Sequence, residues 1–268
     1  MNQVVRIARK VSQRCLALQK AWMVWTLRDS SRQELTRLGT SYGGWTVPAT
    51  AIAPGRIAIC VGAGEDISFD VELNKRGMTV FTMDPTPRAK KHVQQVLDGV
   101  GGDSVVAINK SPVEHYDLAG FDPLRFRFLE LGLSDQDQVM HFYAPKNPEH
   151  VSHSIVNIQH TEDFFEARCV RLQTLCSSFN IVEIEILKLN IEGAEYAVLE
   201  DLIGGELRPQ VICVDFDEGS IPQDDGYMKR IAGAVQRLRK SGYRLLKVDG
   251  WNFSFVLGQL TIQGPQVN

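Results

Sequence analysis

Short apolar runs that end abruptly in glycine or polar residues recur along this chain of 268 residues. The clearest run spans residues 56–61, and the sequence Gly-Ala-Gly-Glu-Asp follows it at 62–66. A continuous apolar run of this length is typical of a strand that is buried on both faces of a parallel sheet. The apolar residues at 67, 69, 71 and 73 allow the chain to continue as a helix. The pattern therefore predicts a strand, a tight turn and a helix.

Strand-like and helix-like patterns alternate over the rest of the chain. Further strands are expected at 79–85, 126–134, 185–189, 210–216, 243–248 and 252–256, with an added strand at 139–143. Helices are expected at 87–97, 191–202 and 227–240. This alternation predicts an α/β fold with a mostly parallel sheet, and the Asp-Gly-Trp turn at 249–251 predicts an antiparallel hairpin at its C-terminal end.

The N-terminal segment has a different pattern, in which apolar residues recur at alternating spacings of four and three. They predict an amphipathic helix with one apolar seam, formed by Val4, Ala8, Val11, Cys15, Leu18, Trp22 and Trp25. Residues 1–38 contain eight basic and two acidic residues, whereas the whole chain has a net charge of −3. We therefore expect a basic helical segment at 1–38 and one larger domain at 39–268. The seam is expected to pack on that domain, on a second subunit, or on an anionic membrane surface.

Composition narrows the class of protein. With 44% apolar and 23% charged residues, the chain can bury a full core. The five cysteines are odd in number and form no C-x-x-C pair, which is typical of reduced thiols in a cytoplasmic protein. No apolar run reaches the length of a membrane-spanning helix. The acidic body of the chain and the lack of a known nucleic-acid motif argue against a nucleic-acid partner.

The glycine turn after the first strand is the first candidate binding site. Gly62 and Gly64 allow a sharp turn and a close approach of the backbone to a ligand. A third glycine, which dinucleotide-binding loops require, is missing, and Glu65 and Asp66 would repel a pyrophosphate. Acids there favour S-adenosylmethionine, whose sulfonium is cationic. Asp84 ends the next strand about 20 residues later, where such folds hold the ribose hydroxyls.

Three segments together resemble the FkbM family of S-adenosylmethionine-dependent methyltransferases. They are the glycine turn with its flanks, Asp84 with Pro85, and the sequence Leu-Lys-Leu-Asn-Ile-Glu-Gly-Ala-Glu at 187–195. The likeness covers roughly residues 42–257 and implies a Rossmann-like class I methyltransferase fold. The resemblance, with the position of the third strand, suggests these cofactor-binding residues: Tyr42, Gly62, Gly64, Glu65, Asp66, Phe69, Asp84, Pro85, Leu133, Ser134 and Asn190. The family usually has aspartate at the position of Asn190.

The same resemblance implies O-methyl transfer to a hydroxyl of a sugar, glycan or polyketide-like acceptor. The candidate catalytic residues are Glu192, Asn190 and His153. Asparagine cannot act as a base at neutral pH, so Glu192 is the first candidate for the general base and His153 the second. No metal is assigned, although Asp215 and Asp217 could hold Mg²⁺ together with Asn190.

Two rival functions remain open. Because of Asn190, one open hypothesis is a protein that binds the cofactor but is itself inactive and acts as a partner of another enzyme. A nicotinamide-dependent oxidoreductase is the other rival, and the acids at 65 and 66 argue against it.

Overall fold

The computed structural model describes residues 34–102, 106–108, 114–144 and 161–258. Two expectations from the sequence lie outside these residues. They are the apolar seam between residues 4 and 25, and the loop that carries His153. No helix in the described part of the chain is both long enough and apolar enough to cross a membrane.

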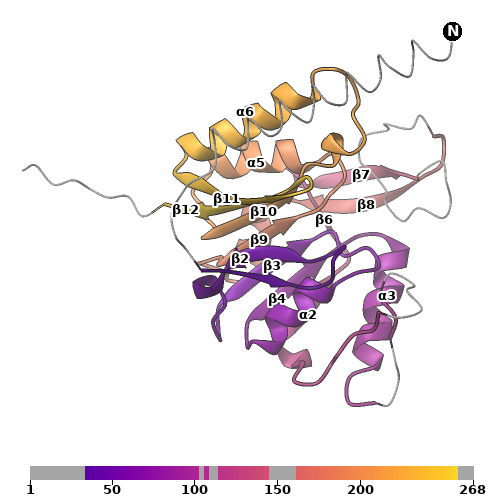
Figure 1. Cartoon of the computed structure of the whole chain (residues 1–268). Coiled ribbons are helices and arrows are strands. Elements are labelled where there is room, and N and C mark those ends of the chain that lie inside the picture. Colours follow the sequence, from indigo (N-terminus) through magenta and orange to yellow (C-terminus); the bar gives the residue numbers. More distant parts are fainter. Residues whose placement is uncertain (1–33, 103–105, 109–113, 145–160, 259–268) are drawn as a thin grey trace, which may run out of the picture.

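The core of the fold is a seven-stranded sheet with the order β11-β12-β10-β9-β3-β4-β5 (Figure 1). Its parallel strands are β3 (Ile57–Val61), β4 (Thr79–Met83), β5 (Phe126–Leu129), β9 (Ile186–Leu189) and β10 (Val211–Asp215). Two further strands, β11 (Tyr243–Asp249) and β12 (Asn252–Leu257), form an antiparallel hairpin at one edge. The expected mostly parallel α/β sheet with a C-terminal hairpin is confirmed.

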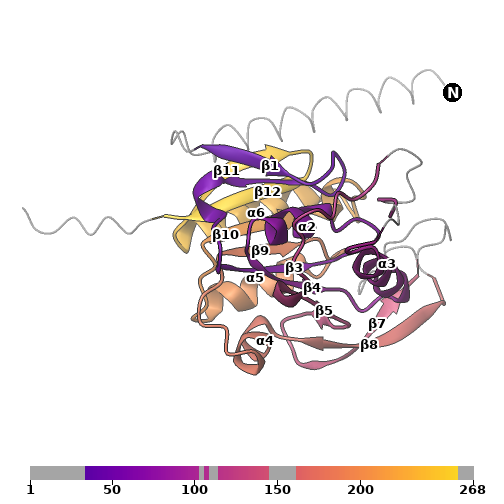
Figure 2. The ribbon, with the colours of Figure 1, turned by 90° about the horizontal axis from the view of Figure 1, so that it is seen from below.

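Helices cover both faces of this sheet (Figures 1 and 2). One face carries α2 (Ser68–Lys75), α3 (Pro87–Asp98) and the hairpin of β1 (Leu35–Leu38) and β2 (Trp45–Pro48). The other face carries α4 (Leu172–Ser178), α5 (Glu195–Gly204) and α6 (Tyr227–Lys240). Short 3-10 turns lie at Ala49–Ala51, Pro123–Arg125 and Asp217–Gly219.

The pleat of β3 divides its side chains between the two cores. Ala58 and Cys60 pack with α2 and α3, whereas Ile59 and Val61 pack with α5 and α6. All four are at most 1% exposed, which explains why this strand is apolar at every position rather than at every second one. Packing on both faces thus fixes the position of β3 in the middle of the molecule. The glycine turn that follows β3 is therefore fixed in position as well.

The expected strand at 126–134 is corrected by the structure. Its first part is β5, which ends at Leu129, and its last part is β6 (Gly132–Leu133), which belongs to a second sheet. That sheet also contains β7 (Gln138–Tyr143), the expected added strand, and β8 (Phe164–Val170), which the sequence did not predict. Glycine suits position 132 because any larger residue would clash: its Cβ would lie only 2.5 Å from Cys169 Sγ on β8.

The expected helix at 191–202 begins later than its apolar pattern predicted, at Glu195. The preceding turn contains Glu192 with φ 49° and Gly193 with φ 101°. Such left-handed conformations cannot be part of a right-handed helix, so the chain between Asn190 and Glu195 forms a turn instead. This correction matters because it removes Glu192 from the helix and places it in a loop.

Other helix ends are confirmed. Pro87 stands at the start of α3, where the Thr86 hydroxyl accepts a hydrogen bond from Ala89 N, and α6 spans the expected residues 227–240. Gly242 follows α6 with φ 96°, in the left-handed conformation that commonly ends a helix.

The β1–β2 hairpin joins residues on both sides of the boundary expected between residues 38 and 39. Leu38, Trp45 and Val47 are buried in the core beneath it. The existence of a separate N-terminal segment, and its contact with a membrane or a second copy, stay predictions.

Deletion of residues 1–33 is expected to leave a cooperative thermal transition, because β1 and both described cores lie beyond this segment. Circular dichroism during heating measures it. A longer deletion that also removes β1 serves as the control and should lower the melting temperature, since it exposes Trp45 and Val47. Loss of the transition in the shorter deletion would show that residues 1–33 are part of the core.

Candidate functional site

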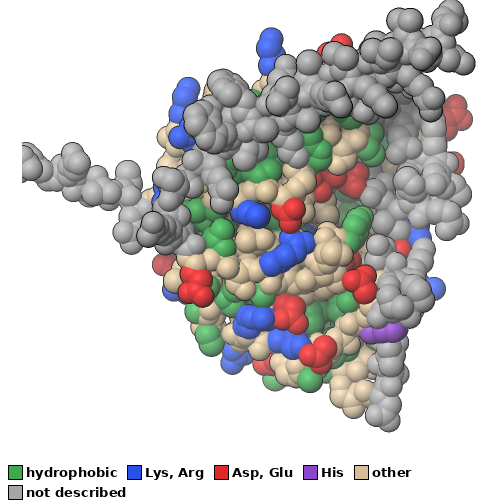
Figure 3. Space-filling model, viewed as in Figure 1, with side chains coloured by type: hydrophobic (Ala, Val, Ile, Leu, Met, Phe, Trp, Pro, Cys, Tyr) green, Lys and Arg blue, Asp and Glu red, His purple; other side chains and the backbone are tan. Residues whose placement is uncertain are grey.

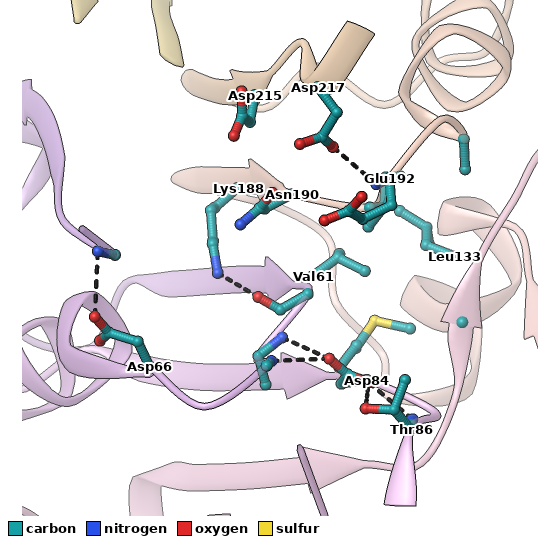
Figure 4. A pocket seen from close by; sticks show the side chains of 18 of the residues that line it. Val61, Asp66, Asp84, Thr86, Leu133, Lys188, Asn190, Glu192, Asp215 and Asp217 are labelled. Atoms are coloured by element: carbon teal, nitrogen blue, oxygen red, sulfur yellow. Dashed lines mark hydrogen bonds between the residues drawn. The ribbon is translucent and has the colours of Figure 1, made fainter. Parts of the chain in front are cut away.

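A pocket opens at the carboxyl ends of the central parallel strands, where β3, β4, β9 and β10 end (Figure 4). In a doubly wound sheet this edge is the usual place for a ligand, because adjacent connections leave a crevice there. The residues that line it are Tyr42, Gly43, Trp45, Val61, Gly62, Ala63, Gly64, Glu65, Asp66, Met83, Asp84, Pro85, Thr86, Gly132, Leu133, Phe142, Lys188, Asn190, Ile191, Glu192, Ala194, Asp215, Asp217 and Asn252.

The glycine turn forms the floor of the pocket. Gly62 has φ 87°, and a Cβ at this position would lie 1.8 Å from the carbonyl oxygen of Asn190. The turns after β3 and β9 are therefore in backbone contact, which a larger residue would prevent. Gly64 has φ 52°, but a Cβ there would meet nothing within 4 Å. The turn thus needs glycine at position 62 for packing, whereas the space beside Gly64 is open.

Asp84 shapes this turn. Its Oδ2 accepts hydrogen bonds from Ala63 N at 2.9 Å and Gly64 N at 3.0 Å. Its Oδ1 accepts from the backbone nitrogen and the hydroxyl of Thr86 at 2.8 and 2.6 Å. Four donors of the chain itself therefore surround the carboxylate that was expected to hold ribose hydroxyls. That role stays a prediction, and the structure adds a second one in ordering the glycine turn.

Asp66 connects the glycine turn to the segment that covers the pocket. Its Oδ2 accepts from the Thr40 hydroxyl at 2.6 Å and from Gly43 N at 3.2 Å, and its Oδ1 accepts from Ser68 N at 2.9 Å. The bonds to Thr40 and Gly43 hold the loop between β1 and β2. Tyr42 lies in this loop with 67% of its surface exposed, at the rim of the pocket.

Acidic side chains form the opposite wall (Figure 4). Asp217 Oδ2 accepts a hydrogen bond from Glu192 N at 3.0 Å. Burial, reinforced by the charges of Glu192 and Asp215, raises the pKa of Asp217 well above its usual range. The Asn252 amide, oriented with its nitrogen toward Asp215, donates to both carboxylate oxygens at 3.2 and 3.3 Å.

Glu195 belongs to the same acidic group. Its side chain is fully buried at the start of α5, and Oε2 accepts from Gly193 N at 2.7 Å. Burial is the main reason that the pKa of Glu195 rises to about 7. Glu195 therefore lies buried behind the acidic wall, where burial favours its protonated form more than it would in water.

Most residues expected at the site line this one pocket. They are Tyr42, Gly62, Gly64, Glu65, Asp66, Asp84, Pro85, Leu133, Asn190 and Glu192. Phe69 and Ser134 are placed elsewhere. Phe69 is 1% exposed and packs in the core beneath α2, because the helix directs it inward. Ser134 is 2% exposed, and its nitrogen donates to Val170 O beside the second sheet. His153 lies outside the described residues.

Several lining residues were not singled out from the sequence. Lys188 belongs to the recognised 187–195 segment, but its position within an apolar strand gave no sign that it reaches a pocket. Asn252 lies at the start of the final strand, and only the sheet order brings it beside Asp215. Phe142 lies on β7 in the second sheet, and the strand that pairs with β7, β8, was not predicted. In these cases long-range pairing, rather than local pattern, places the residue.

The suggested Mg²⁺ site of Asp215, Asp217 and Asn190 stays a prediction. Among the described residues, no group of three or more His, Cys, Asp or Glu side chains is arranged to hold a metal ion. Asp215 and Asp217 are instead engaged with Asn252 and Glu192.

Comparison with known proteins gives one family match. The family described as the methyltransferase FkbM domain matches residues 77–245. No curated protein sequence matches the chain significantly. Similar solved structures include an rRNA methylase of Streptococcus thermophilus, with 11% identity, coverage of 79% of this chain and 92% of that one, and a TM-score of 0.37. The fibrillarin pre-rRNA processing protein of Methanococcus jannaschii has 11% identity, coverage of 87% and 86%, and a TM-score of 0.38.

Proposed function

Since this chain belongs to the methyltransferase FkbM family, we propose that it uses S-adenosylmethionine to methylate a hydroxyl of a sugar, glycan or polyketide-like acceptor. The observation that carries this proposal is the pocket at the ends of β3, β4, β9 and β10, with the glycine turn as its floor. When bound, the cofactor supplies an electrophilic methyl group on a cationic sulfur.

The charges of the pocket fit this cofactor. Six lining residues are acids, namely Glu65, Asp66, Asp84, Glu192, Asp215 and Asp217, and Lys188 is the one basic residue among the described lining. On the face seen in Figure 3, acidic and basic side chains are interspersed instead. An acidic cavity favours a ligand with sulfonium and ammonium groups, and it disfavours the pyrophosphate of a nicotinamide cofactor. The open space beside Gly64 allows a ligand to approach the backbone.

The acidic wall can take up the proton of the acceptor hydroxyl. Since burial keeps Asp217 protonated at neutral pH, Glu192 is the better candidate for an ionised base. The left-handed turn at Glu192 and its hydrogen bond to Asp217 fix the backbone of this residue at the pocket wall. Asn190 lies next to it and can orient a hydroxyl, but it cannot accept the proton. His153 stays the second candidate.

Titration calorimetry on the full chain tests the cofactor. S-adenosylmethionine or its demethylated product should bind with measurable heat, because both carry an ammonium group and an adenosine that suit the pocket. NAD should give no comparable heat, since the acids at 65 and 66 oppose its pyrophosphate. Tight binding of NAD and none of S-adenosylmethionine would overturn the proposal in favour of an oxidoreductase.

A second candidate function is binding of the cofactor without methyl transfer. Only Asn190 favours it, because the family usually has an acid at this position. Methyl transfer to a panel of hydroxyl-bearing acceptors separates the two functions. Cofactor binding without transfer to any acceptor, together with transfer by Asn190→Asp, would favour the inactive partner.

A further inference from the structure

A row of buried polar side chains crosses the central sheet near the carboxyl ends of its strands. Cys60 on β3 is in register with Thr82 on β4 and with Lys188 on β9. Lys188 is in register with Cys213 on β10, which in turn faces Ser254 on β12. All five side chains are at most 3% exposed. Because in-register neighbours project from the same face of a sheet, the lysine lies between two small thiols, and the one charged residue of the adjacent strands β3 and β10 is Asp215 at the end of β10.

The ammonium group of Lys188 has little to balance it. Nζ donates to Gly62 O at 2.6 Å, which is its one hydrogen bond within the described part of the chain. Asp70 on α2 is an acid on this face; its Oδ1 accepts from the Thr82 hydroxyl, and its Oδ2 has no hydrogen-bond partner among the described residues. Burial raises the pKa of Asp70 more than the charge of Lys188 lowers it, which weakens Asp70 as a counter-charge. A buried ammonium in such surroundings is costly unless an anion pairs with it.

The pocket is where such an anion can reach Lys188. The side chain lines the pocket, and Figure 4 shows its amino group directed at the carbonyl that follows Val61, between Asp66 and Asn190. Glu192 lies beyond Asn190 in the same view. Lys188 and Glu192 therefore line one cavity, with Asn190 between them in this view.

We propose that Lys188 binds the carboxylate of the methionine part of S-adenosylmethionine. This inference rests on the proposed function and adds a residue and an orientation to it. The cofactor has one carboxylate, and every other charged side chain in the described lining is acidic, so any other placement would set this anion against acids. With the carboxylate at Lys188, the rest of the cofactor is free to extend toward Glu192 and Asp84.

A pair of ligands tests the proposal on the unmodified protein. Decarboxylated S-adenosylmethionine lacks the carboxylate but keeps the sulfonium, the amine and the adenosine. By calorimetry, the full chain should bind S-adenosylmethionine about 10- to 100-fold more tightly, as a charge-assisted hydrogen bond between buried groups provides. Equal affinity, within about threefold, would overturn the proposal. Binding of neither ligand would instead count against the proposed function itself.

Lys188→Met tests the residue, because methionine replaces the ammonium with an apolar group. The affinity of this variant for S-adenosylmethionine should fall to the affinity that the unmodified chain has for the decarboxylated ligand. The substitution should change the affinity for the decarboxylated ligand itself by less than about threefold. Lys240→Met, at the exposed end of α6, is the matched control and should leave both affinities unchanged. Equal losses for the two ligands in Lys188→Met would assign the lysine to shaping the glycine turn through Gly62, and the proposal would fail. If this variant does not fold, Lys188→Arg, which keeps the charge, must retain the preference for the carboxylate.

Discussion

Turnover is expected to fall about 10²–10⁴-fold when Glu192 is replaced by glutamine, while the affinity for S-adenosylmethionine stays nearly unchanged. Glutamine preserves the size of the side chain and removes its ability to accept a proton. The structure makes this substitution informative, because Glu192 lies in a left-handed turn before α5 rather than in the first turn of the helix. A favourable interaction with the helix dipole is therefore not its main role, and folding should tolerate the change.

Asp217→Asn is the matched control for that experiment. Burial already holds a proton on Asp217 at neutral pH, and an asparagine oxygen can still accept the hydrogen bond from Glu192 N. Turnover should therefore fall much less than in Glu192→Gln. Single-turnover rates with a known acceptor, together with calorimetry of the cofactor, provide the comparison. Near-full turnover in Glu192→Gln, with its loss in His153→Ala, would move the base to the histidine.

Replacing Gly62 with alanine is expected to cost several kcal/mol of folding free energy and to abolish cofactor binding. The left-handed conformation alone costs an alanine about 1–2 kcal/mol. The new Cβ would in addition lie 1.8 Å from Asn190 O, so the turns after β3 and β9 would have to separate. Overpacking of a rigid site typically adds about 1–3 kcal/mol. Because both turns line the pocket, the damage to stability and to binding should appear together.

Gly55→Ala separates the two effects. Gly55 has φ 79°, but a Cβ there would meet nothing within 4 Å, and the residue does not line the pocket. Its substitution should cost only the conformational part, about 1–2 kcal/mol, and should leave cofactor binding intact. Urea unfolding measures both variants. Similar losses in the two would refute the close contact between Gly62 and Asn190.

The central strands could be predicted from the sequence because burial on both faces leaves a continuous apolar run, as in β3 and β10. The end of β5 could not, because the alternation of apolar residues continues through Gly132 although the chain has changed sheets. β8 was missed although its sequence does alternate, with Phe165, Ala167 and Cys169 less exposed than the residues between them.

At the site, the residues next to glycines or strand ends could be predicted, since turn chemistry marks them locally. The pocket positions of Lys188 and Asn252 depend on which strands are neighbours, and Phe69 was misplaced because a helix turned it toward the core. Local sequence thus indicated the loops that surround the pocket, whereas the side chains that reach into it were decided by the topology.

The walls of the pocket come from distant parts of the chain, and this has a consequence for biosynthesis. Arg37, beside the covering loop, is paired with Asp249 at 2.9 Å across 212 positions of sequence, and Asn252 on the last strand holds Asp215. During translation the glycine turn emerges early, yet it cannot be enclosed until the final hairpin has left the ribosome. Contacts of such long range form late in folding. Ligand capture would therefore have to wait for the synthesis of β12, and nascent chains that lack β12 would be unable to retain the cofactor.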